Sequence, residues 1–156
     1  MTERAQTRRD TDTLAEAWSN PSGLWGWLTI VNHKNVGRRF IVTGLIFFVL
    51  GGVMALLMRT QLAVPEATFL DADFYNQMFT MHGTTMMFLF AIPMLEGLMI
   101  YLMPLMIGTR DMPFPRLNAF GYLAYLFGGT LIFSSFIVGE VPREGWFAYV
   151  PLASDI

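Results

Sequence analysis

The chain has 156 residues, of which 54% are hydrophobic and only 14% are charged, against about 25% charged in an ordinary soluble domain. The formal net charge is -2 and there is no cysteine, which excludes a disordered chain, a disulfide scaffold, an iron–sulfur cluster and a nucleic-acid-binding surface. We therefore expect an all-α integral membrane protein in a lipid bilayer, or a piece of one.

The N-terminal part of the chain precedes the first long apolar segment. Residues 1–12 form a polar tail, and residues 13–39 contain Trp18, Trp25 and Trp27. Indole rings favour the headgroup region of a bilayer, so we predict that residues 13–39 lie along the inner interface. The membrane domain then covers residues 40–152, and residues 153–156 are the end of the chain.

Three segments almost free of charge predict membrane spans near residues 40–60, 76–107 and 118–139. About 20 apolar residues are needed to cross a hydrocarbon core of ~30 Å, and each segment is long enough. None has the polar stripe of a helix in a soluble bundle, which argues against that alternative. The second segment is longer than one crossing needs and contains Pro93 and Pro104, so we expect kinks in it.

The basic residues predict the orientation of these spans. Eight of the ten Lys and Arg residues lie before the first span or between the second and third, which is one side of the membrane if the spans alternate. The loop 60–75 has three acidic residues and no basic one, as an outer loop should. We therefore expect a multi-pass protein of a bacterial plasma membrane with a cytoplasmic N-terminus.

Ionisable residues inside a span are costly, so each is a candidate functional residue. His82 lies in the outer part of the second span, where it either binds a metal through one ring nitrogen or forms an interhelical hydrogen bond. Gly83 beside it leaves room for a bulky planar group. Arg59, at the outer end of the first span, either binds an anion or a polar haem substituent, or extends to the headgroups.

Three further features carry alternatives. Glu96 shares nearly one face of an ideal helix with His82, so it is a proton relay or the partner of a neighbouring helix. Asp111 and Asn118 bracket the inner loop. Either Asp111 collects protons and the Asn118 amide holds a water chain, or Asp111 is a solvated acid and Asn118 caps the third helix. Met99 and Met103 suggest a rival function, a three-span copper(I) transporter, although thioethers are also adaptable packing groups.

The histidines set one limit on a metal site. The second histidine, His33, lies on the inner side and cannot share a metal with His82 near the outer side. A six-coordinate haem on His82 therefore needs a second axial ligand from outside this chain.

The motifs of the chain resemble the N-terminal part of subunit I of haem–copper respiratory oxidases, from residue 32 to residue 152. The order and spacing of the matching strings make this resemblance specific. These strings are Asn32-His33-Lys34, Tyr75-Asn76, Thr80-Met81-His82-Gly83, Met103-Pro104-Leu105-Met106-Ile107-Gly108, Asp111-Met112-Pro113-Phe114-Pro115-Arg116-Leu117-Asn118 and Gly145-Trp146-Phe147-Ala148-Tyr149-Val150-Pro151-Leu152.

The resemblance implies a haem-binding role for the outer residues. In the family, the histidine matching His82 is an axial ligand of a low-spin haem, of a-type or b-type. The arginine matching Arg59 contacts a polar substituent of that haem. The residues matching Tyr75 and Trp146 form hydrogen bonds with its propionates.

The resemblance also implies a proton path and a larger assembly. Asp111 matches the mouth of a proton-uptake channel, and Asn118 matches a residue that lines it. The family's subunit I has a twelve-helix architecture, reduces oxygen to water and pumps protons. The second low-spin haem ligand, the high-spin haem and the copper belong to its later spans. We therefore expect a fragment or a split subunit that is inactive alone, whose partners are the remaining helices, the other oxidase subunits and cytochrome c.

Two departures from the family pattern are informative. An asparagine of the channel mouth has no counterpart within residues 96–102. The ubiquinol-oxidising branch has Arg, Asp and His where this chain has Leu50, Met54 and Phe74, and only Gln77 of that quinone site is retained. This favours cytochrome c as the electron donor, with ubiquinol oxidase subunit I as the alternative.

Overall fold

The computed structural model describes residues 11–13 and 22–151, and within these ranges it contains helices and no strands. Most of the polar tail, Trp18 and the end of the chain at 153–156 lie outside the described residues. The chain divides into two units, residues 1–30 and 31–156. Helix α2, Gly23–Thr29, belongs to the first unit and carries Trp25 and Trp27.

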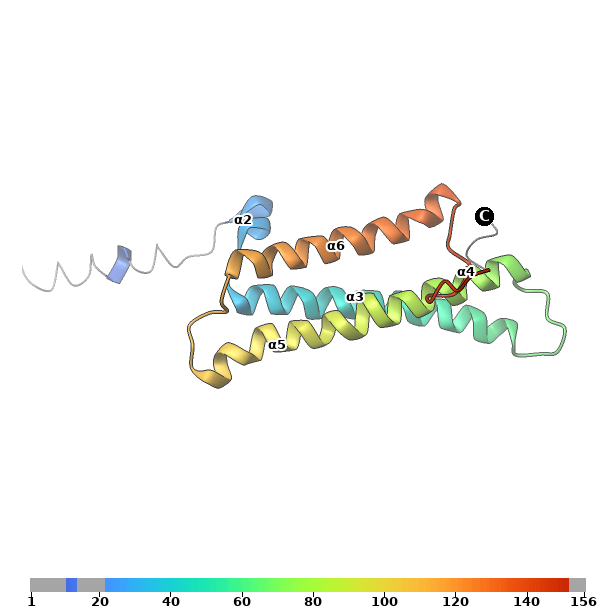
Figure 1. Ribbon diagram of the computed structural model, residues 1–156, viewed down its shortest axis with the longest axis horizontal. Coiled ribbons are helices and arrows are strands. Elements are labelled where there is room, and N and C mark those ends of the chain that lie inside the picture. The colour runs from blue at the N-terminus through green and yellow to red at the C-terminus, as the bar shows by residue number, and fades with distance from the viewer. Residues whose placement is uncertain (1–10, 14–21, 152–156) are drawn as a thin grey trace, which may run out of the picture. The chain divides into compact units, whose positions relative to one another are not determined.

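The second unit contains three long apolar helical segments (Figure 1). The first is α3, His33–Gln61. The second runs from residue 72 to residue 107 and comprises α4 (Ala72–Thr84), η1 (Thr85–Ala91) and α5 (Ile92–Ile107). The third is α6, Pro115–Val138. Each segment is long and apolar enough to cross a membrane, which confirms the expected all-α fold with three spans.

The helices begin earlier than the charge-free segments do. Helix α3 starts at His33 because the side chain of Asn32 accepts a hydrogen bond from the Lys34 amide, so residues 33–39 are helical although they are rich in charge. Asp71 caps α4 in the same way by accepting from the Phe74 amide at 2.7 Å. Capping residues rather than apolar content therefore determine where α3 and α4 begin.

The second segment changes its hydrogen-bond pattern at the position of a predicted kink. Residues Thr85–Ala91 form a π-helix directly ahead of Pro93. Pro93 has no N–H and cannot donate to the Leu89 carbonyl one turn earlier. The hydroxyl of Tyr125 on α6 donates to this carbonyl at 2.6 Å, so the irregular turn is bonded to the third segment.

Helix α3 packs against α4, η1, α5 and α6. Its closest approach to α5 is at Gly37 and Gly97. A Cβ atom on Gly37 would lie 2.8 Å from the Gly97 carbonyl oxygen, and one on Gly97 would lie 2.7 Å from Cβ of Phe40. The two glycines therefore permit the crossing, as small residues commonly do between membrane helices.

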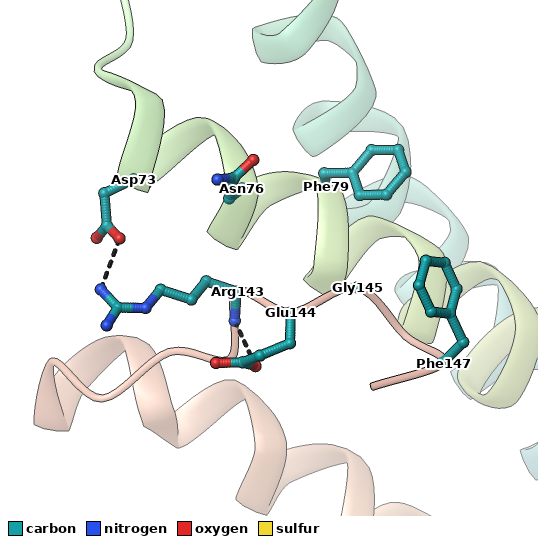
Figure 2. Close-up of a pocket in the computed structure, with 7 residues that line it drawn as sticks. All are labelled: Asp73, Asn76, Phe79, Arg143, Glu144, Gly145 and Phe147. Atoms are coloured by element: carbon teal, nitrogen blue, oxygen red, sulfur yellow. Dashed lines mark hydrogen bonds and ion pairs between the residues drawn. The ribbon is translucent and has the colours of Figure 1, made fainter. Parts of the chain in front are cut away.

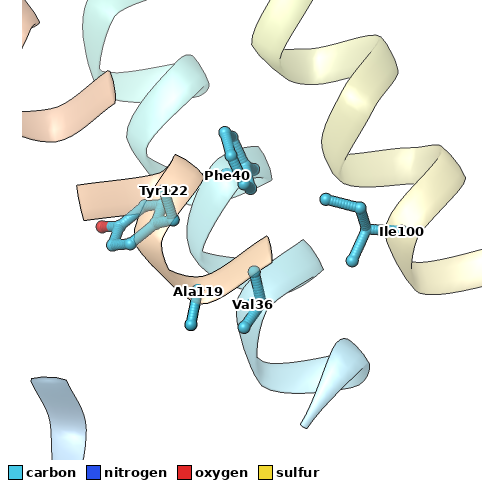
Figure 3. Close-up of a cluster of buried hydrophobic side chains, with 5 residues drawn as sticks. All are labelled: Val36, Phe40, Ile100, Ala119 and Tyr122. Atoms are coloured by element: carbon cyan, nitrogen blue, oxygen red, sulfur yellow. The ribbon is translucent and has the colours of Figure 1, made fainter. Parts of the chain in front are cut away.

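Two buried clusters occupy opposite ends of this bundle. We call them the inner cluster, near the α5–α6 loop, and the outer cluster, near the α3–α4 loop. The inner cluster contains Val36, Phe40, Ile100, Ala119 and Tyr122 (Figure 3). The outer cluster contains Met54, Met58, Met78 and Met81.

Candidate functional site

The outer candidate site is built around His82 on α4. Its Nδ1 lies 2.9 Å from the backbone carbonyl oxygen of Gly51 on α3. A carbonyl can only accept, so Nδ1 carries the proton and Nε2 carries the free lone pair. The expected interhelical hydrogen bond is present, and it leaves the other nitrogen available to bind a metal.

Gly51 is the functional residue that sequence reasoning missed at this site. A Cβ atom on Gly51 would lie 2.8 Å from Sδ of Met86 in η1, so no larger residue fits here without a shift. The close approach brings the Gly51 carbonyl within reach of His82. The signal was the Gly51-Gly52 pair in the middle of an otherwise bulky apolar segment.

Trp146 lies against Gly83, the residue that follows His82 in α4. Its indole ring contacts Gly83, where a Cβ atom would lie 3.0 Å from Cδ1 of the ring. The ring centroid is also 6.0 Å from that of Phe88 in η1. Gly83 was expected to admit a planar group, and in this structure that group is the Trp146 side chain.

Tyr75 and Arg59 lie closer to the outer ends of their helices. Tyr75 packs against the outer cluster. It precedes His82 by seven residues, or about 10 Å along α4. Arg59 is exposed in the last turn of α3, about 12 Å beyond Gly51, and its guanidinium forms no hydrogen bond or ion pair with the described residues. The structure thus brings Trp146 to Gly83, the residue after His82, with Tyr75 and Arg59 about two helical turns nearer the α3–α4 loop.

A cleft of about 450 Å³ lies between α4 and the segment after α6 (Figure 2). At its edge, Nη1 of Arg143 lies 2.7 Å from Oδ1 of Asp73. The hydrogen bond to Asp73 and its charge raise the pKa of Arg143. The cleft is lined by Asp73, Asn76, Phe79, Arg143, Glu144, Gly145 and Phe147.

The inner candidate site pairs Asp111 with His33. Oδ1 of Asp111 accepts hydrogen bonds from the backbone amides of His33 at 3.1 Å and Met112 at 2.8 Å. The His33 side chain is 3% exposed, and its Nδ1 lies 3.2 Å from the same carboxylate oxygen. Despite this short distance, neither ring nitrogen forms a hydrogen bond with the described residues. The sequence separated His33 from His82, as the structure does, but gave no sign of the contact of His33 with Asp111.

Asn118 has a different neighbour from the one expected for a helix cap. Helix α6 begins at Pro115, after Phe114 with φ of 55°. Asn118 therefore lies past the first turn, and its amide donates to the Pro113 carbonyl at 3.4 Å. Asp111 and Asn118 lie at the same end of the bundle, but no hydrogen bond joins them.

Glu96, Met99 and Met103 are all exposed on α5. The π-helix between His82 and Glu96 changes the helical phase, so the expected common face is wrong: His82 contacts α3, whereas Glu96 does not face it. The described residues contain no cluster of three His, Cys, Asp or Glu side chains that could hold a metal ion.

Comparison with known proteins gives consistent results. Residues 35–155 match the family model described as cytochrome c and quinol oxidase polypeptide I. Subunit 1 of the cytochrome c oxidase of Alkalihalophilus pseudofirmus is 49% identical over 141 residues, which are 90% of this chain and 23% of that protein. The corresponding Bacillus subtilis subunit is 45% identical over 91% of this chain and 23% of its own length.

A quinol oxidase is also among the relatives. Quinol oxidase subunit 1 of Bacillus spizizenii is 44% identical over 85% of this chain and 20% of its own length. The chain thus spans less than a quarter of the length of these curated relatives. The resemblance noted from the motifs is confirmed, and with three apolar helices and bacterial relatives the chain is a multi-pass membrane protein.

Proposed function

Because the chain belongs to the cytochrome c and quinol oxidase polypeptide I family, we propose that it forms the first three helices of a terminal oxidase subunit I and supplies an axial ligand to its low-spin haem. The observation that carries the proposal is the hydrogen bond from Nδ1 of His82 to the Gly51 carbonyl. A ligating histidine usually donates its other N–H to such a partner, which fixes the ring and its tautomer.

The residues of the outer end fit a haem. His82 would ligate iron through Nε2, while Arg59, Tyr75 and Trp146 would donate to polar groups at the haem edge. The Thr85 hydroxyl, three residues beyond His82, is fully buried and has no hydrogen-bond partner in the described residues. When bound, the haem supplies an iron that accepts and releases single electrons.

At the inner end, Asp111 would take up protons together with His33. A neutral imidazole beside a carboxylate gives two groups that can hold a proton in turn. Asn118 would line the path beyond the loop. This function places the inner cluster on the cytoplasmic side, with a cytoplasmic N-terminus. The predicted interfacial segment 13–39 is too long, because residues 33–39 belong to α3.

The proposed electron donor is cytochrome c. The three positions that would form a quinone site are apolar, and Met54 is buried in the outer cluster. Gln77 donates to Asp73 at 2.8 Å and is therefore engaged within α4. Oxidation of reduced cytochrome c by the purified complex, with no turnover on ubiquinol, is the expected result, and the reverse would contradict this assignment.

The central test is His82→Ala in the assembled oxidase. We expect the low-spin haem absorption band to disappear, because the other described histidine lies at the opposite end of the bundle. Gln77→Ala is a matched control on the same helix and should keep the band. A full low-spin band in the His82→Ala enzyme would refute the proposal.

A further inference from the structure

The segment that follows α6 is attached to α4, the helix that carries His82, at three levels. We call this segment, residues 140–147, the outer strap. Arg143 pairs with Asp73, the Gly145 amide donates to the Thr80 hydroxyl, and Trp146 lies against Gly83. The three contacts follow one another in the same order along both elements.

Only the middle contact is buried. Thr80 is 3% exposed, whereas Arg143 and Asp73 are each 52% exposed at their side chains. The Thr80 hydroxyl donates to the Asn76 carbonyl at 2.8 Å and accepts from the Gly145 amide at 2.9 Å. A hydroxyl offers one donor and two acceptor positions, so both bonds form at once.

The Gly145 amide, which donates to the Thr80 hydroxyl, directly precedes Trp146, the residue that this hydroxyl positions. Gly145 has φ of 82°, a left-handed conformation that favours glycine, and Trp146 follows directly. The bond from Gly145 to Thr80 therefore fixes the backbone one residue before the indole ring. That ring then lies over Gly83, adjacent to His82.

We propose that Thr80 is a positioning residue for the low-spin haem, because its hydroxyl holds Trp146 at the haem edge. The proposal rests on the proposed function of His82 and assigns a role to a side chain that does not touch the haem. A displaced Trp146 no longer donates to a carboxylate of the haem edge. More negative charge near the iron favours the ferric state, so the midpoint potential falls.

The test uses the complete oxidase with Thr80→Val, which removes the hydroxyl at nearly constant shape, and Thr80→Ser, which keeps it. In Thr80→Val we expect faster hydrogen–deuterium exchange in residues 144–147 and a lower midpoint potential of the low-spin haem. Thr80→Ser should restore both values toward the wild type. Asp73→Asn, which weakens the exposed contact with Arg143 and leaves the Thr80 bond in place, should leave the potential unchanged.

Trp146→Phe completes the experiment. We expect it to lower the potential as Thr80→Val does, and the double variant should add nothing to the larger single effect. Unchanged exchange in Thr80→Val, an unchanged potential, or additive effects in the double variant would each overturn the role of Thr80. These outcomes test Thr80 alone. Failure of the proposed haem-ligand function would be seen separately, as a low-spin band that persists in His82→Ala.

Discussion

The outer and inner ends of the bundle use the same helices but pack them with different side chains. The outer cluster consists of four methionines, which are flexible and adapt to irregular neighbours. The inner cluster combines branched and aromatic residues. There the Phe40 ring stacks at 5.4 Å on Tyr125 and meets the edge of Tyr122 at 5.3 Å. The end proposed to hold a haem is thus the adaptable one.

Polar contacts follow the same division. At the inner end, the Thr43 and Tyr122 hydroxyls lie 3.0 Å apart in a buried contact between α3 and α6. At the outer end, the equivalent role falls to His82, which uses only one of its two nitrogens. The outer end thus keeps the Nε2 lone pair of His82 for another group, while at the inner end both ring nitrogens of His33 lack a hydrogen-bond partner in the described residues.

The largest expected effect tests the rigidity of the inner cluster. Phe40→Ala removes a side chain that is 1% exposed and contacts two tyrosine rings, so we expect a loss of about 3 kcal/mol or more in unfolding free energy. Met81→Ala, at a fully buried position of the outer cluster, should cost less, about 2 kcal/mol, because the neighbouring methionines can adapt to the space it leaves. Thermal unfolding of the purified complex measures both. Equal losses would remove the contrast between the two ends.

The helix crossing should give the next largest effect. Gly97→Ala places a Cβ atom 2.7 Å from Cβ of Phe40, and we expect it to cost about 1–3 kcal/mol and to reduce the yield of assembled complex. Gly52→Ala is the matched control, because no atom lies within 4 Å of its new Cβ. A stable Gly97→Ala protein would show that α3 and α5 separate without cost.

A third prediction separates the two ends by function. Asp111→Asn keeps an oxygen that can accept from the His33 and Met112 amides but removes the charge. We expect proton uptake and turnover to fall at least about tenfold while the low-spin haem band remains. Stopped-flow measurement of proton uptake tests this. Glu140→Gln, at the outer end, should behave as the wild type, and normal uptake in Asp111→Asn would refute the role of the inner site.

The smallest expected effect concerns the exposed pair of Arg143 and Asp73. The hydrogen bond to Asp73 raises the pKa of Arg143. Any stabilisation of the fold by this pair is therefore present at every pH below the ordinary pKa of arginine. It is lost only as the pH rises through the higher pKa of the folded state. Stability between pH 6 and pH 9 should therefore not change with this group. We expect Arg143→Gln to unfold like the wild type at high salt. A pH-dependent difference in that range would contradict it.

The sequence was sufficient for features that depend on composition. Three spans follow from the scarcity of charge, and His82 stands out because a histidine is costly in a span. The start of α3 could not be read in this way, since the cap at Asn32 makes residues 33–39 helical despite their charge. Pro93 predicted a kink, but the sequence did not indicate that the turn before it is a π-helix.

Contacts between distant residues were the other part that the sequence did not provide. Gly51 contributes a backbone carbonyl, and any residue has one, so only the packing of α3 on α4 identifies it as the partner of His82. The pairing of His33 with Asp111 likewise depends on where the α5–α6 loop meets the start of α3. Motif resemblance named single residues as candidates, and the fold supplied their partners.

The bond between Tyr125 and Leu89 has a consequence for how the chain enters the bilayer. Outside this contact, the Tyr125 hydroxyl would lie in hydrocarbon without an acceptor, at a cost of about 1–2 kcal/mol. Residues 72–107 and α6 are joined by a short loop, so both can leave the translocon together as a helical hairpin. If the two segments insert as a pair, the Leu89 carbonyl of one accepts the hydrogen bond of the Tyr125 hydroxyl of the other.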